Sequence, residues 1–449
     1  MSGQICSSKA LWCVAAALSL FLISCGSSTE FYKNVEQDIA EGKYDRAIAG
    51  IRENRSSYGD KSTVLYNLDL GVLYHYAGQA DSSNRHFFAA ETEIEKLYTK
   101  SISLAAMSVL LNDNVLPYEG EDFEKVLLNV FLALNYAEKG QPDEALVEAR
   151  KVDLKLREYT KEYEGKNKYQ EDAFIRYIAG ALYESGGEVN DAFISYRKAY
   201  EAYQTYAREY GTPGPGFLLD DLVRTATLMA FNDEAAEYRS LGGKPYIRSS
   251  KPAGSVLVIA YAGKGPIKEE IRPTVSIPDS SGTLHTFQIA LPKFVPRYIG
   301  KRTYNVVAQI RGDSLGPIAA RTEIAENVTA IASKTLDDRL ALIYLKGGGR
   351  ALMKFLAAEK AKNELKKKED KLVNILGSIA LDLAIGATEQ ADVRTWRTLP
   401  AEFQLARLNL PPGDYAISVT ASDGGYNLPE EKITVRSGKT AFVIVDDVR

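Results

Sequence analysis

The spacing of apolar and polar positions divides the chain into two halves of different character. From Phe31 to about Gly243, apolar residues recur at helical spacing between frequent polar breaks, without the alternation typical of strands. Helices joined in pairs by short turns explain this pattern. We therefore expect a helical domain at residues 31–245.

Small and aromatic residues recur within these expected helix pairs. A small residue is followed about one turn later by a tyrosine in three places, and small residues then reappear on the following helix. This arrangement resembles tetratricopeptide repeats, in which such positions pack the first helix of a pair against the second. The expected packing residues are Gly71, Tyr74, Ala133, Tyr136, Ala145, Gly180, Tyr183 and Ala192.

A helix pair of this kind cannot bury its apolar face alone, so neighbouring pairs are expected to stack into a curved array. The concave surface of such an array suits a peptide or a helix of another protein. The spacing between the copies is irregular, with a long insert between Tyr98 and Glu124. The repeat interpretation nevertheless predicts a protein partner on the concave helical surface.

The C-terminal half has the composition of β-strands. Residues 211–216 are rich in glycine and proline and end the preceding helix, and one short helical segment follows. Strands are expected at 255–261, 303–310, 415–420, 432–436 and 441–445. These strands predict a β-rich segment at 251–322 and a C-terminal, sandwich-like β module at 391–449. The fold class is therefore multidomain α + β.

Residues 323–390 are expected to form a helical insertion between the two strand groups. The charged run from Lys366 to Asp370 is typical of a solvated helix face. The stretch from Leu372 to Ala387 is more apolar, but it contains Asp382 and is shorter than the roughly 20 residues that span a bilayer. We favour a helix or hairpin packed on the sheets over membrane contact.

Composition and charge give little support to a nucleic-acid role. The chain has 449 residues, 45% of them hydrophobic, and a formal net charge of -4. This composition is ordinary for a globular protein, and the chain is long enough for two or three cores. It has no surplus of basic residues to neutralise phosphates.

The three cysteines, Cys6, Cys13 and Cys25, all lie at the N-terminus. An apolar run from Leu11 to Leu22 follows Lys9, as in an export signal. The next residues end in Ser24 and Cys25 and resemble a bacterial lipobox. The resemblance implies a signal peptide at 1–24, cleavage after Ser24, acyl chains including palmitate on Cys25, and a lipidated tether at 25–30. The residue after Cys25 is not an aspartate, and by resemblance to the sorting rule of enteric lipoproteins this favours the periplasmic face of the outer membrane over the inner membrane.

Several stretches together resemble an uncharacterised family of bacterial envelope lipoproteins. They are Tyr118 to Glu124, Leu134 to Tyr136, Ala145 to Arg150, Gly265 to Lys268, Arg321 to Ile324, and above all Ala391 to Pro400 with Leu410 to Tyr415. The resemblance implies a lipoprotein with a tetratricopeptide-like part, and a link to outer-membrane lipoproteins that regulate peptidoglycan synthesis. The family motif is carried by Asp392, Arg394, Trp396 and Pro400.

A structural explanation is favoured for this motif. A hydrogen-bonded pair of Asp392 and Arg394, with Trp396 covering the core before a strand, accounts for these residue types without a ligand.

Sequence motifs for catalysis are weak. The histidines His75, His86 and His285 show no metal-ligand spacing, so we expect no metal, no cofactor and no enzymatic activity. Glycines 347–349 are interpreted as a helix break, and the Arg311 to Ser314 sequence as a turn.

Two alternatives to a scaffold or assembly factor stay open. One is a peptidoglycan hydrolase using the carboxylates between Glu119 and Glu124. The other is a carbohydrate-binding module with an aromatic strip including Tyr415 or Tyr426.

Overall fold

The computed structural model describes residues 30–110, 114, 116–248, 253–278, 284–298, 302–310, 316–341, 343–345, 390–423, 427 and 430–448. Several sequence interpretations lie outside these residues: the signal peptide, Cys25 and its tether, the Arg311 to Ser314 turn, glycines 347–349, the charged run at Lys366, the apolar stretch from Leu372, and Tyr426.

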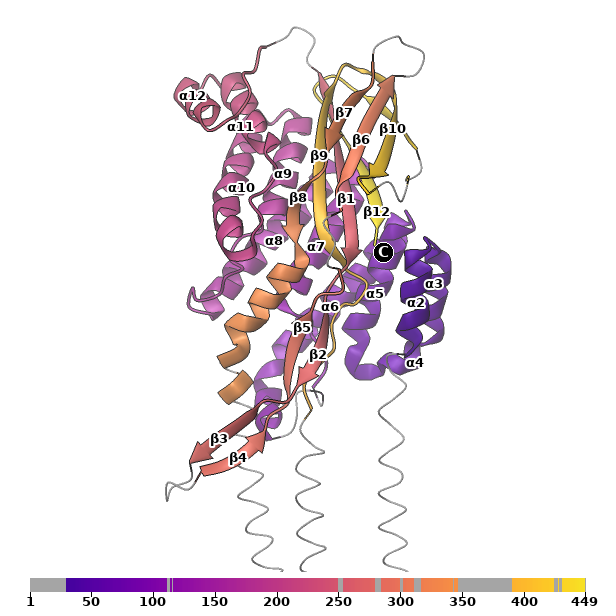
Figure 1. Cartoon of the computed structure of the whole chain (residues 1–449), viewed down its shortest axis with the longest axis vertical. Coiled ribbons are helices and arrows are strands. Elements are labelled where there is room, and N and C mark those ends of the chain that lie inside the picture. The colour runs from indigo at the N-terminus through magenta and orange to yellow at the C-terminus, as the bar shows by residue number, and fades with distance from the viewer. Residues whose placement is uncertain are drawn as a thin grey trace, which may run out of the picture.

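The described chain is helical in its N-terminal half and contains β-sheets in its C-terminal half, which confirms a mixed α + β fold (Figure 1). The helices are α2 (Glu30–Ala40), α3 (Tyr44–Glu53), α4 (Arg55–Tyr58), α5 (Thr63–Tyr76), α6 (Ala80–Leu110), α7 (Asp122–Glu138), α8 (Pro142–Glu162), α9 (Ala173–Gly186), α10 (Val189–Tyr210), α11 (Phe217–Leu228) and α12 (Asn232–Ser240). A further helix covers residues 328–341.

The strands in the described part of the chain belong to two four-stranded sheets and two two-stranded ribbons. They are β1 (Gly254–Lys264), β2 (Ile267–Ile271), β3 (Thr274–Pro278), β4 (Leu284–Gln288), β5 (Leu291–Val295), β6 (Tyr304–Ile310), β7 (Ile318–Arg321), β8 (Glu323–Asn327), β9 (Pro400–Leu410), β10 (Gly413–Ala421), β11 (Glu431–Val435) and β12 (Thr440–Asp447).

Consecutive helices pack side by side from α5 to α12, each against the next (Figure 1). The turn between α9 and α10 passes through Gly187, whose φ of 88° lies in the left-handed region that favours glycine at a helix C-terminus. Residues 211–216 end α10 as expected, but two helices follow instead of one, because Met229 to Phe231 interrupt the pattern between α11 and α12.

Two glycines allow helices to approach closely within the pairs. A Cβ on Gly71 would lie 2.5 Å from the Phe87 ring, and one on Gly180 would lie 2.5 Å from the Tyr196 ring. Ala133, Ala145 and Ala192, the small residues expected at packing positions, are fully buried. The tyrosines expected beside them are only partly buried, and pack against the edge of the core: Tyr74, Tyr136 and Tyr183.

Strand β1 is buried on both faces, which explains its uninterrupted apolar sequence. Its residues Val256 and Val258 join an apolar cluster shared between the two four-stranded sheets. The alternate residues Leu257, Ile259 and Tyr261 join the core of the helical half. One continuous core therefore connects the helices to the sheet that contains β1.

The two β-rich segments expected from the sequence contribute to the same sheets. One sheet has the order β12-β1-β9-β8 and the other β11-β10-β6-β7, so each sheet contains strands from both segments. In the first sheet, β1 pairs with β12 in parallel and with β9 in antiparallel orientation. The expected helical insertion starts later than residue 323, because Glu323–Asn327 pair with β9 as strand β8.

Candidate functional site

The first helices of the pairs face the chain's own sheet. On α5, the Nε2 atom of His75 shares a hydrogen bond of 2.7 Å with the hydroxyl of Tyr261 on β1. On α7 and α9, Phe131 and Phe174 contact the ring of Phe403 on β9, at centroid distances of 5.7 and 5.0 Å. The sheet thus occupies the helical face that the repeat pattern suggests for a partner.

Arg407 of β9 connects this sheet to helices α9 and α11. Its guanidinium donates to Glu184 at 2.8 Å and to Asp221 at 3.1 Å, and Arg224 pairs with the same two carboxylates. Burial raises the pKa of Glu184, but Arg407 and Arg224 outweigh this and hold it at about 2. The four charges compensate one another within the core, which is the condition for burying them.

The motif from Asp392 to Pro400 leads into β9, and several of its residues are buried. The backbone N–H of Trp396 and the hydroxyl of Thr395 both donate to Glu124 on α7 at 2.8 Å. Thr398 donates to Asp69 on α5 at 2.8 Å. The indole of Trp396 is fully buried and meets the Phe87 ring edge-on at 5.8 Å. The motif therefore fixes the start of β9 between α5, α6 and α7.

The salt-bridged pair expected from the motif is present. Arg394 donates to both carboxylate oxygens of Asp392, at 2.6 and 2.8 Å, and to the carbonyl of Leu116 at 3.1 Å. The side chain of Pro400 is buried at the first position of β9, where its missing N–H is tolerated. These residues have structural partners.

The carboxylates between Glu119 and Glu124 also have structural partners. Glu121 is paired with Lys268 and Arg339; burial raises its pKa, but these cations outweigh burial and lower it to about 2. Glu124 accepts from Tyr118 and Trp396, and burial raises its pKa. The cavity beside them, lined by Asp122, holds only about 10 Å³, room for one water.

His75 and His86 serve packing. His75 is buried, with Asn135 at 2.6 Å on its second ring nitrogen, and burial lowers its pKa to about 4. His86 stacks on Tyr74 and contacts Asn67, and His285 lies on β4. Within the described part of the chain, no three His, Cys, Asp or Glu residues are placed to hold a metal ion.

The aromatic strip suggested for carbohydrate binding does not include Tyr415. Its ring is buried between the two sheets, and its hydroxyl donates to the carbonyl of Pro411 at 2.9 Å. The alternation of β10 turns this side chain inward, toward the apolar cluster.

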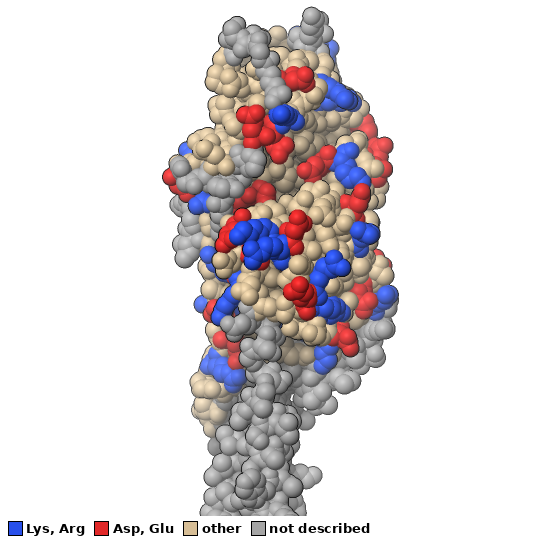
Figure 2. All heavy atoms as spheres, turned by 90° about the vertical axis from the view of Figure 1, so that its right-hand side faces the viewer, with Lys and Arg blue, Asp and Glu red and all other residues tan. Residues whose placement is uncertain are grey.

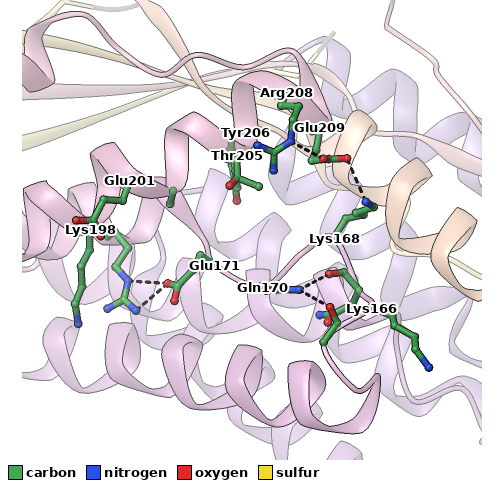
Figure 3. Close-up of a pocket in the computed structure, with 14 residues that line it drawn as sticks. Lys166, Lys168, Gln170, Glu171, Lys198, Glu201, Thr205, Tyr206, Arg208 and Glu209 are labelled. Carbon is green, nitrogen blue, oxygen red and sulfur yellow. Dashed lines mark hydrogen bonds and ion pairs between the residues drawn. The ribbon is translucent and has the colours of Figure 1, made fainter. Parts of the chain in front are cut away.

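An open groove runs along the other side of the helices, over α8, α9 and α10. It consists of two adjoining hollows of about 210 and 470 Å³ that share Arg176 and Lys198. The smaller hollow has an apolar floor that includes Ala149, Ile175 and Ala179. The larger one lies between α10 and residues 165–171 (Figure 3). We call the two hollows together the α8–α10 groove.

Charged side chains line the rims of the α8–α10 groove. Arg176 bridges its two sides through Asp153 at 2.5 Å and Glu171 at 2.8 Å. In Figure 3, Glu171 points toward this guanidinium, and Glu209 lies between Arg208 and Lys168. Lys198 is exposed and forms no ion pair with any described residue. A charged rim over an apolar floor is suited to an amphipathic peptide or helix.

The face of the molecule shown in Figure 2 has a different character. Acidic and basic side chains are interspersed over it, without a continuous basic patch among the described residues. This distribution fits the net charge and does not suggest phosphate-backbone binding there.

No protein-family model matches the chain, and no curated protein matches it in sequence. Among the described helices, none is both long enough and apolar enough to cross a bilayer.

Proposed function

We propose that the chain is an exported bacterial lipoprotein of the cell envelope. In this proposal it is cut before Cys25, anchored by lipid on that cysteine, and held at the periplasmic face of the outer membrane. Support comes from the order of Lys9, the apolar run and the Leu22 to Cys25 box. Two or more acyl chains give stable anchoring because each buried methylene contributes about 0.8 kcal/mol.

We further propose that the anchored protein acts as a non-enzymatic, protein-binding scaffold or assembly factor. The observation that carries this proposal is the α8–α10 groove, which is open while the opposite helical face is covered by the sheet. Its partner is an envelope protein that presents an amphipathic helix or peptide with a carboxylate for Lys198. A link to peptidoglycan synthesis rests on the family resemblance of the motif around Trp396.

The finer description of the fold belongs to the same proposal. Gly71 and Gly180, each facing an aromatic ring of the next helix, support a tetratricopeptide-like array. The apolar cluster shared by the two four-stranded sheets supports a sandwich-like module. In this proposal the helical array packs against the β module of the same chain, and the α8–α10 groove stays open for a partner.

Co-purification from the envelope tests the scaffold proposal. The wild-type lipoprotein, Lys198→Glu and Lys161→Glu are each isolated from membranes after mild crosslinking. Lys161 is the matched control, because it is an exposed lysine at the end of α8 outside the groove lining. We expect one envelope protein to be captured by the wild type and by Lys161→Glu and lost from Lys198→Glu. Equal capture by both variants would contradict the groove as the binding site.

A further inference from the structure

Strands β3 and β4 form an arm that projects from the body of the molecule (Figure 1). Among the described strands they pair with each other alone, in antiparallel register from Thr274 with Gln288 to Pro278 with Leu284. Leu284 is 65% exposed, and Thr274, Ser276, Thr286 and Gln288 are exposed as well. The arm is thus a two-stranded ribbon that no third described strand joins.

The base of the arm is held firmly against the helices. The ribbon of β2 and β5 leads into it, and Lys268 of β2 is buried in an ion pair with Glu121. Phe294 of β5 meets the ring of Phe123 edge-on at 5.8 Å. The arm therefore projects in a direction fixed by the helical body.

The composition of the arm is unusual for a solvated hairpin. Neither strand contains a lysine, arginine, aspartate or glutamate, although the chain as a whole is 25% charged. Charged residues of both signs lie at its base: Arg272 is paired with Glu270 at 2.7 Å, and Lys293 of β5 lies opposite Glu269 of β2. An isolated two-stranded hairpin is at best marginally stable in water, so a surface that covers one side would stabilise it.

The position of the arm indicates which surface this is. The arm lies at the lower end of the molecule in Figure 1, and the N-terminal helices α2 and α4 lie in the same half. Cys25 precedes Glu30 by five residues, which span at most about 18 Å when fully extended. A lipid on Cys25 would therefore hold this half of the molecule close to the bilayer.

We propose that the β3–β4 arm lies in the headgroup region of the bilayer that holds the lipid anchor. This inference rests on the proposed lipid anchor on Cys25. The arm does not enter the hydrocarbon core, because the unpaired N–H and C=O groups along its two edges need water or headgroups as partners. Its two uncharged strands lie at the interface, while the paired charges at its base, Glu270 with Arg272 among them, stay in the hydrated headgroup layer.

Depth-dependent fluorescence quenching tests this placement. An environment-sensitive fluorophore is attached to Leu284→Cys, to Thr286→Cys, and to Glu237→Cys as the control on α12 at the opposite end of the molecule. The full lipoprotein is purified from membranes and reconstituted in phosphatidylethanolamine and phosphatidylglycerol vesicles. Some vesicles carry a spin label near the headgroup and others at the end of the acyl chain. A palmitate analogue reports lipidation in the same samples.

We expect a blue shift of both arm fluorophores and loss of their intensity with the headgroup-proximal spin label, with neither effect at Glu237→Cys. Unshifted arm emission in a protein that carries the palmitate label would overturn the inference and leave the lipid anchor standing. A blue shift without quenching by either spin label would also overturn it, because a protein surface would then cover the arm. Absence of the palmitate label would contradict the proposed anchor itself.

Discussion

Arg407 on β9 and Glu184 on α9 are joined by a 2.8 Å hydrogen bond across the boundary between the sheet and the helices. The two residues lie 223 positions apart in the sequence, and both are withdrawn from solvent. Asp221 and Arg224 on α11 complete the group. The helical half and the sheet are therefore joined by a charged network as well as by a continuous apolar core.

Removing Arg407 should strongly destabilise the protein. In Arg407→Met, Glu184 and Asp221 would share only Arg224 and one buried negative charge would stay uncompensated. Breaking such a buried network costs about 3–5 kcal/mol in the free energy of unfolding. Urea denaturation measures this loss, with the exposed Arg436→Met as the control. A loss no greater than that of the control would show that the network contributes little.

Adding a methyl group at Gly180 should force α9 and α10 apart. The new Cβ of Gly180→Ala would lie 2.5 Å from the Tyr196 ring, so the free energy of unfolding should fall by about 1–3 kcal/mol. Gly186→Ala on the same helix is the matched control, since its Cβ would meet only a Glu188 oxygen at 3.5 Å. Thermal unfolding of both variants makes the comparison. Equal stability would mean that the close approach at Gly180 is not needed.

Because His75 is buried, the protein should lose stability in mild acid. Burial lowers its pKa from 6.5 to about 4, so between these values the unfolded chain binds a proton that the folded chain does not. Stability therefore falls as the pH falls through this window, by about 3 kcal/mol in total. Burial raises the pKa of Asp172 to about 6, so this carboxyl group titrates in the same pH range. The contribution of His75 is therefore measured as the difference in the free energy of unfolding between the wild type and His75→Gln. A difference in the free energy of unfolding that stays constant from pH 6.5 to pH 4 would contradict this assignment.

Cys25→Ser should abolish lipidation while the export signal remains. The sulfur to which lipid is attached is lost, so the precursor should stay uncleaved or reach the wrong location. Metabolic labelling with a palmitate analogue, followed by fractionation, measures both effects. Label retained by the variant would remove the basis for the lipid anchor.

Local features of the fold were predictable from the sequence because they depend on neighbouring residues. Helical spacing predicts the helices from Phe31 onward, and the strands β1, β6, β10, β11 and β12 follow from β-prone runs bounded by turns. Gly71 and Gly180 were identifiable because close helix packing needs a small residue at a fixed position. The position of Trp396 before a strand also agrees with its buried contacts.

Features that depend on distant pairing were not predictable. The sequence around Ile324 has helical spacing, but pairing with β9 makes it a strand, because tertiary contacts override weak local preference. Arg407 appears in the sequence as one arginine within a β-prone run, and its partners Glu184 and Asp221 are far away along the chain. Lys198 has no local sequence signal, since the groove exists only when α8, α9 and α10 come together. The coverage of the inner helical face by the sheet was missed for the same reason.

Site-specific photo-crosslinking in living cells tests the scaffold account most directly. A photoreactive residue replaces Ser195, which lines the α8–α10 groove, or the exposed Arg197 two positions further along α10, which does not. The account predicts that Ser195 gives one crosslinked product with an envelope protein, that Arg197 does not, and that adding Lys198→Glu removes the product. Equal crosslinking from both positions, or none from Ser195 in a lipidated and folded protein, would contradict it.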